Sequence, residues 1–230
     1  MSGDTDSPAL PRLAIDPALA GVVRIGVLTY DDVIVAPESS ALAREIEKSC
    51  RDLQARYSGT ASAAVPGVEE ARSLYKALGI DPTKTRPSNE ALLRRVLKGA
   101  GLSTVNTLVD AVNLAALRFQ LPYGLYDVDR LTPPLVLRKG ATDEAYEGIR
   151  KGVVHLAGRP LIADRHGPFG NPTSDSARTM ITSGTRRALV VLYAPGGWDS
   201  RRVSAILDGT ADIFDRHSGG RVSGRGLIPD

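Results

Sequence analysis

The chain has 230 residues, of which 42% are hydrophobic and 24% are charged, and it carries a formal net charge of +3. This length supports one domain with a full hydrophobic core, and a charge this small permits a nucleic-acid partner without requiring one. The single cysteine excludes a disulfide framework and a cysteine-rich metal site, and no apolar run approaches the roughly 20 residues that a membrane-spanning helix requires.

The first part of the chain is predicted to contain a disordered lead, a strand and two helical segments. Residues 1–11 are the predicted lead, and the first 20 residues lack the basic segment of a secretory signal. A chain without disulfides is compatible with the cytoplasm, where we expect this protein. A strand is predicted over 22–29, and helical segments over 38–57 and 68–78. Cys50 falls on the apolar stripe of the first helix and is predicted to be a buried structural thiol, not a nucleophile.

The helix predicted from residue 88 onward has an apolar side and a basic outer face. Ser88 can cap its first turn, and Gly99 and Gly101 end it, because glycine tolerates the left-handed backbone that closes a helix. Between residues 84 and 118, six basic residues stand against two acidic ones, so phosphate binding would fall here. A solvated helix face explains the same charges without a ligand. The residues predicted to contact RNA are Arg86, Arg94, Arg95 and Lys98.

The next predicted helix carries a polar stripe directly beside its apolar stripe. Asn106, Asp110 and Asn113 lie about 100° round from the apolar residues, since each residue turns a helix by roughly that angle. Buried amides and a carboxylate in that place can line the rim of a pocket, where they must find partners. They can equally bind neighbouring backbone or solvent.

A Pro-Tyr-Gly turn ends this helix and leads into a predicted strand. Pro122 and Gly124 turn the chain, and Tyr123, Leu125 and Tyr126 begin the strand. Tyrosines in such a place more often pack in a core or at a rim, although their hydroxyls would suit a ligand pocket.

Short strands dominate the rest of the chain and set the expected fold class. The predicted strands cover 135–138, 153–156, 160–163 and 188–193, and a last helix covers 200–214. Residues 218–230 are predicted to be a flexible tail. Helices first and strands later predict an α+β fold with one domain over 12–217, in which helices group around a mixed sheet or layered β-sandwich.

Several catalytic chemistries have no support in the sequence. His155, His166 and His217 are far apart and belong to no close ligand cluster, so no metal is expected. There is no Walker loop, Gly99-Ala-Gly101 lacks the third glycine of a dinucleotide motif, and no nucleophile elbow surrounds a serine. No cofactor is therefore expected. A hydrolase with these residues would position water and substrate instead of forming a covalent intermediate.

Taken together, the segments from 85 to 194 resemble a known family. RPSNEALLRRVLKGAGL (86–102), VNTLVDAVN (105–113) and LPYGLYDVD (121–129), followed by GRPLIAD (158–164), GPFG (167–170) and SDSARTMIT (174–182), are similar to the B3/B4 domain of the phenylalanyl-tRNA synthetase beta subunit. In the synthetase that domain hydrolyses tyrosine wrongly attached to its tRNA. The resemblance implies a layered sheet with helices packed on one side. The chain would be a free-standing form of that domain, without the machinery of a complete tRNA ligase.

The resemblance also assigns roles to residues of this chain. The pocket asparagine of the family falls on Asn113 and a pocket glycine on Gly158. The family's histidine falls on Gly124, so that side chain is absent, and the family's glutamate falls at Thr173 or Asp175. Since a polar partner for the phenol discriminates tyrosine from phenylalanine, tyrosine need not be the substrate here. Free-standing members carry an Arg-Thr pair, which matches Arg178 and Thr179.

These assignments lead to three hypotheses. In the first, the protein binds the charged 3′ end of a tRNA and hydrolyses the ester. Asn113 would orient the aminoacyl group, Gly158 would admit the ligand, and Asp175 or His155 would hold water. The other residues expected at the ligand are Tyr123, Gly124, Tyr126, Arg178 and Thr179. The second is a non-catalytic module that binds tRNA or an amino-acid-like ligand, and the third is a small-molecule hydrolase without an RNA partner. No membrane partner is expected.

Overall fold

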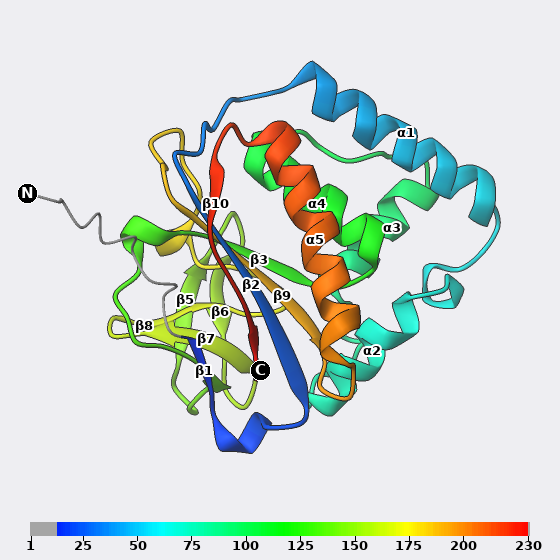
Figure 1. Ribbon diagram of the computed structural model, residues 1–230. Helices are drawn as coiled ribbons and strands as arrows, with labels where there is room; N and C mark the ends of the chain where they lie inside the picture. Colours follow the sequence, from blue (N-terminus) through cyan, green and yellow to red (C-terminus); the bar gives the residue numbers. More distant parts are fainter. Residues whose placement is uncertain (1–12, 230) are drawn as a thin grey trace, which may run out of the picture.

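The computed structural model describes residues 13–229 and shows an α+β fold of three layers, as predicted (Figure 1). The central layer is an antiparallel sheet with the strand order β10-β2-β9-β3. Its strands are β2 (Val23–Asp31), β3 (Tyr123–Asp127), β9 (Ala188–Pro195) and β10 (Arg221–Ile228). The prediction of a disordered lead over residues 1–11 lies outside the described residues.

Helices cover one face of the central sheet. The helices are α1 (Ser40–Tyr57), α2 (Val68–Ala77), α3 (Ser88–Leu97), α4 (Thr107–Phe119) and α5 (Ser200–His217). Helices α4 and α5 pack directly on the sheet, and α1 and α3 lie outside α4 (Figure 1). No helix within residues 13–229 has the length and apolar character needed to cross a membrane.

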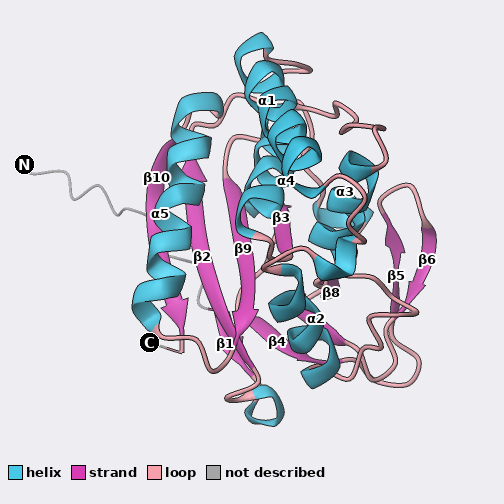
Figure 2. Cartoon of the chain, turned by 90° about the vertical axis from the view of Figure 1, so that its right-hand side faces the viewer, coloured by secondary structure: helices cyan, strands magenta, loops and turns pink. Residues whose placement is uncertain are grey.

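A second sheet covers the opposite face of the central sheet. Its strands, in the order β1-β4-β7-β8, are β1 (Leu13–Ile15), β4 (Leu135–Lys139), β7 (Pro160–Asp164) and β8 (Gly167–Gly170). The β1-β4 pair is parallel and the other pairs are antiparallel, so this sheet is mixed. A separate hairpin, β5 (Ala145–Gly148) with β6 (Gly152–His155), stands at the side of the molecule beyond α3 (Figure 2).

The three layers explain the continuous apolar run in β9. Alternate residues of a strand point to opposite faces: Val190 and Leu192 pack against α4 and α5, whereas Val191 and Tyr193 pack against the second sheet. Because both faces are covered, the strand has no solvated side that would require polar residues. Cys50 is buried in a third cluster under α1 and α3, as predicted, and burial raises the pKa of its thiol.

Two local predictions near the helices are wrong. Pro87, not Ser88, precedes the first turn of α3, and the Ser88 hydroxyl donates to the carbonyl of Pro172 at 3.1 Å instead of capping the helix. Helix α4 begins at Thr107, so Asn106, which was predicted to lie on the polar stripe of the helix, is instead the cap that precedes its first turn.

The predicted flexible tail is also wrong for most of its length. Residues Arg221–Ile228 form β10 and pair antiparallel with β2, with a register shift between Val222 and Gly224. The glycines and arginines of this segment hide the strand from pattern analysis. Its stability comes from the neighbouring β2, which supplies backbone hydrogen bonds that depend little on side-chain character.

Candidate functional site

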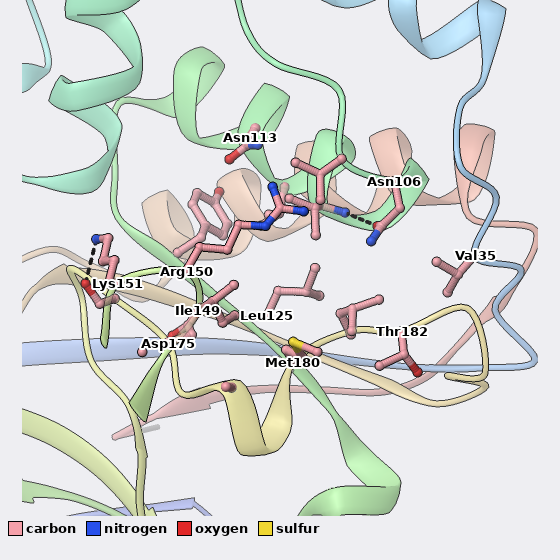
Figure 3. Close-up of a pocket in the computed structure, with 18 of the residues that line it drawn as sticks. Val35, Asn106, Asn113, Leu125, Ile149, Arg150, Lys151, Asp175, Met180 and Thr182 are labelled. Atoms are coloured by element: carbon pink, nitrogen blue, oxygen red, sulfur yellow. Dashed lines mark hydrogen bonds between the residues drawn. The ribbon is translucent and has the colours of Figure 1, made fainter. Parts of the chain in front are cut away.

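A cavity of about 1000 Å³ opens between α4, β3 and the β5-β6 hairpin. One side of it is apolar, with Val35, Val109, Leu125, Ile149 and Met180 among the lining residues (Figure 3). Polar and charged side chains line the rest, chiefly Asn113, Arg150, Lys151 and Asp175. A large apolar chamber with a few convergent polar groups is the usual form of a ligand site.

Asp175 is an acidic residue of this cavity whose side chain is hydrogen-bonded to a residue of the protein core. It is partly buried, and one of its carboxylate oxygens accepts a hydrogen bond from the Tyr126 hydroxyl at 2.8 Å. Burial raises the pKa of Asp175 to about 7, while the bond from Tyr126 and the charge of Lys151 act in the opposite direction. Both protonation states are therefore populated near neutral pH, as suits a general base.

Two glycines make room for the tyrosine that holds Asp175. Tyr126 is fully buried, and a Cβ atom added at either Gly124 or Gly170 would overlap its hydroxyl. The phenol therefore stands in the space from which a side chain at position 124 would start. Burial and the neighbouring charge of Asp175 hold the pKa of Tyr126 far above its ordinary value, so it stays a neutral donor.

Further phenols fix the loop that carries Asp175. The Tyr75 hydroxyl donates to the carbonyl of Pro172 at 2.7 Å, and the Tyr146 hydroxyl donates to the carbonyl of Ser174 at 2.6 Å. The Asn171 side chain accepts from the next two backbone amides of the loop, those of Thr173 and Ser174. With its backbone held at several points, Asp175 has a defined position relative to the cavity.

Asn106 and Asn113 of the predicted polar stripe both line the cavity, and they differ in their hydrogen bonds. Asn106 accepts from the backbone N–H of Val109 at 3.0 Å, and Asp110 accepts from that of Val105 at 3.0 Å, so both bind neighbouring backbone. The amide of Asn113 has no such hydrogen bond to a residue in the described part of the chain, and it points into the cavity from α4 (Figure 3). It is therefore available to a ligand.

The β5-β6 hairpin brings two cations to the cavity. The Lys151 ammonium donates to the Ser174 hydroxyl at 2.8 Å, next to Asp175. Arg150 extends across the cavity toward α4 (Figure 3). Neither residue stood out in the sequence, although the glycines that flank Ile149-Arg150-Lys151 are a turn signal that could have revealed a hairpin.

Other residues predicted for the site lie outside the cavity. His155 is exposed on β6, and Gly158 lies in an exposed turn. Arg178 forms a two-pronged ion pair with Asp164, with distances of 2.9 and 3.1 Å, which joins η4 (Ala177–Thr179) to β7. Thr179 is fully buried. Strand direction explains His155, because its position on β6 turns it to solvent and not toward Asp175.

The predicted tyrosines and Gly124 stand at the cavity in different ways. Tyr123 lines it, but its hydroxyl is shared with Thr210 of α5 at 2.9 Å. Tyr126 and Gly124 lie behind the cavity, on the face of β3 that packs against the second sheet, and reach it only through Asp175. Tyr126 is thus placed to position Asp175, not to touch a ligand.

The basic face of α3 borders a second, smaller depression of about 650 Å³. Arg86, Arg94 and Lys98 line it, while Arg95 points elsewhere and donates to Ser103 at 2.9 Å. Arg86 also pairs with the buried Glu90 at 3.3 Å. Arg94 and Lys98 are exposed and form no ion pair with another residue of the described range. These two are the cations open to a phosphate.

The described residues contain no group of three or more side chains that could hold a metal ion.

Comparison with known proteins places the site within a recognised sequence family. The model of the B3/4 domain matches residues 70–204. Phenylalanine–tRNA ligase beta subunits of Rickettsia felis and Rickettsia conorii are 32% and 30% identical over 95 residues, which is 40% of this chain. The chain spans about 12% of the length of these relatives.

A solved structure is also similar. An N-terminal fragment of the phenylalanyl-tRNA synthetase beta subunit from Pyrococcus horikoshii aligns with 95% of this chain and 54% of its own length. The two are 12% identical, and the TM-score is 0.47.

Proposed function

The chain belongs to the B3/4 domain family, and on that premise we propose that it binds the aminoacylated 3′ end of a tRNA and hydrolyses the aminoacyl ester. The observation that carries this proposal is the convergence of Asp175 and Asn113 on one cavity, with Tyr126 holding Asp175 from behind. The pairing of a general base with an orienting amide is what ester hydrolysis by water needs.

In the proposed reaction, Asp175 is the general base. Its carboxylate accepts a proton from a water molecule as the water attacks the ester carbonyl, and the terminal ribose hydroxyl leaves with the proton. Lys151, which adjoins Asp175 through Ser174, adds positive charge where the carbonyl oxygen becomes negative. Asn113 hydrogen-bonds the aminoacyl group and sets the carbonyl in line with the water. The proposal does not include His155, because that side chain points to solvent.

The basic depression provides a site for the tRNA backbone. Ser88, the first residue of α3, lines the main cavity, and Arg86, two residues earlier, lines the basic depression. A nucleic-acid strand whose end enters the cavity would therefore pass Arg94 and Lys98. Contacts of this kind position the substrate and weaken with salt.

A binding module without turnover is the alternative that one observation favours. Position 124 is glycine, and Tyr126 fills the space that a side chain there would need. The family resemblance places a histidine at this position, and in this chain no side chain at position 124 takes its place.

Incubation with a complete pool of charged tRNA separates the two functions. Wild-type protein should release one amino acid or a few selectively, Asp175→Asn should abolish release, and Asn113→Ala should slow it at least about tenfold with the fold intact. Asp143→Asn, at an exposed position with no ion pair to another described residue, is the matched control and should behave as wild type. Tight tRNA binding without release of any amino acid would establish the binding module instead.

A further inference from the structure

Arg150 is an exposed residue that lines the main cavity, and its side chain forms no ion pair with Glu147 or Asp175, which line the same cavity. Arg150 stands at the tip of the β5-β6 hairpin and extends over the cavity toward α4, in the direction of Asn113 (Figure 3). Among residues 13–229 it forms no hydrogen bond or ion pair through its side chain, unlike Arg138 and Arg178, which each grip a carboxylate with two nitrogens. A guanidinium fork left open in a cavity is suited to a carboxylate or a phosphate.

The backbone at Arg150 is held in a conformation that a glycine would adopt at lower cost. Its φ is 56°, in the left-handed region that residues with a Cβ disfavour by roughly 1–2 kcal/mol. Two residues later the same hairpin has Gly152 in the same region, at φ 69°. An arginine at the costlier position is consistent with a role for its side chain.

The hairpin is also fixed relative to Asp175. The backbone N–H of Ile149 donates to the carbonyl of Asp175 at 3.1 Å, and Gly148 pairs with Ser176 in an isolated bridge. These backbone contacts fix the position of Arg150 in the chain relative to that of Asp175. Leu125 and Ile149 line the same cavity, and opposite charges at a protein surface attract each other more strongly than in bulk water.

We propose that Arg150 forms an anion subsite of the cavity, which binds a carboxylate or phosphate group of the ligand while Asp175 faces the scissile ester. This inference rests on the proposed function for the position of the ester. Two parts of an aminoacyl-tRNA end could supply the anion. One is the side-chain carboxylate of an acidic amino acid, and the other is the phosphate that joins the terminal nucleotide to the one before it.

Four non-hydrolysable analogues distinguish these sources. They are 3′-deoxyadenosines that carry glutamate or glutamine through an amide at the 3′ position, each with and without a 5′-phosphate. Calorimetric titration of wild-type protein should show about tenfold tighter binding of the analogue with the recognised anion. A preference for glutamyl over glutaminyl analogues identifies the carboxylate, and a preference for phosphorylated analogues identifies the phosphate.

Arg150→Gln should remove the preference, because glutamine keeps polar contacts and loses the charge. Arg201→Gln, at an exposed position on α5 with no ion pair to another described residue, should retain it, and circular dichroism should show both variants folded. Equal binding of all four analogues to wild type, a preference that survives Arg150→Gln, or no binding of any analogue would each overturn the subsite.

Ester hydrolysis is scored separately on charged tRNA. An anion preference without hydrolysis keeps the subsite and rejects the proposed catalysis. Hydrolysis that requires Asp175 but shows no dependence on Arg150 rejects the subsite alone.

Discussion

Asp175→Asn should stabilise the fold while it removes activity. A carboxyl whose pKa rises from 3.8 to about 7 on folding binds its proton more tightly in the native state, so wild-type stability falls as pH rises through this window. Each tenfold change in proton affinity corresponds to about 1.4 kcal/mol, which sets an upper bound of about 4 kcal/mol above pH 7. Because the cavity admits water to Asp175, we expect about 2 to 4 kcal/mol.

The difference in stability between Asp175→Asn and wild type should depend on pH. Well below pH 3.8 the carboxyl is protonated in both the folded and the unfolded chain, so the variant and wild type should have equal free energies of unfolding. The difference should grow between pH 4 and 7 and then stay constant, since asparagine can still accept the hydrogen bond from Tyr126.

Urea denaturation at several pH values from 4.5 to 8 measures this difference. Asp143→Asn, at an exposed position, serves as the control and should follow wild type throughout. If Asp175→Asn were less stable than wild type at pH 8, or if the difference did not change with pH, the argument from burial would be refuted.

Three further variants test other parts of the structure. Tyr126→Phe removes a hydrogen bond that lowers the pKa of Asp175, so the rising limb of the pH profile for hydrolysis should move to higher pH; an unmoved limb would contradict this. Glu90→Ala leaves Arg72, which lies 2.8 Å from the buried carboxylate, without its partner, and urea denaturation should show a loss of about 2 to 4 kcal/mol. Arg150→Gly should match wild type or gain up to about 1 kcal/mol in the same assay, because it relieves the left-handed backbone; a clear loss would count against that.

The helices and buried strands could be predicted because their apolar periods are regular. Helix α5 follows such a pattern and begins behind Asp199, which caps it by accepting from the backbone N–H of Arg202 at 2.8 Å. Strand β9 is a continuous apolar run between turn residues. Strand β10 escaped prediction because it depends on pairing with β2, about 190 residues earlier in the chain, and no local pattern records such a partner.

The site was predictable only in part, for a related reason. Asn113 could be found from its place beside the apolar stripe of α4, and Asp175 from a family resemblance. The phenols that hold the loop of Asp175, such as Tyr75 and Tyr146, come from segments distant in sequence. Arg150 lies at the tip of a hairpin, and the direction of its side chain depends on tertiary contacts of that hairpin, which the local sequence does not reveal.

The packing of Tyr126 between Gly124 and Gly170 limits the order in which these positions can mutate. A side chain introduced first at 124 or 170 would collide with the phenol, so such a change is accessible only after Tyr126 has been replaced by a smaller residue. That first step would take from Asp175 its hydrogen-bond donor. A histidine at position 124 would therefore require a second change at position 126, and Gly124, Tyr126 and Asp175 form one sterically coupled group.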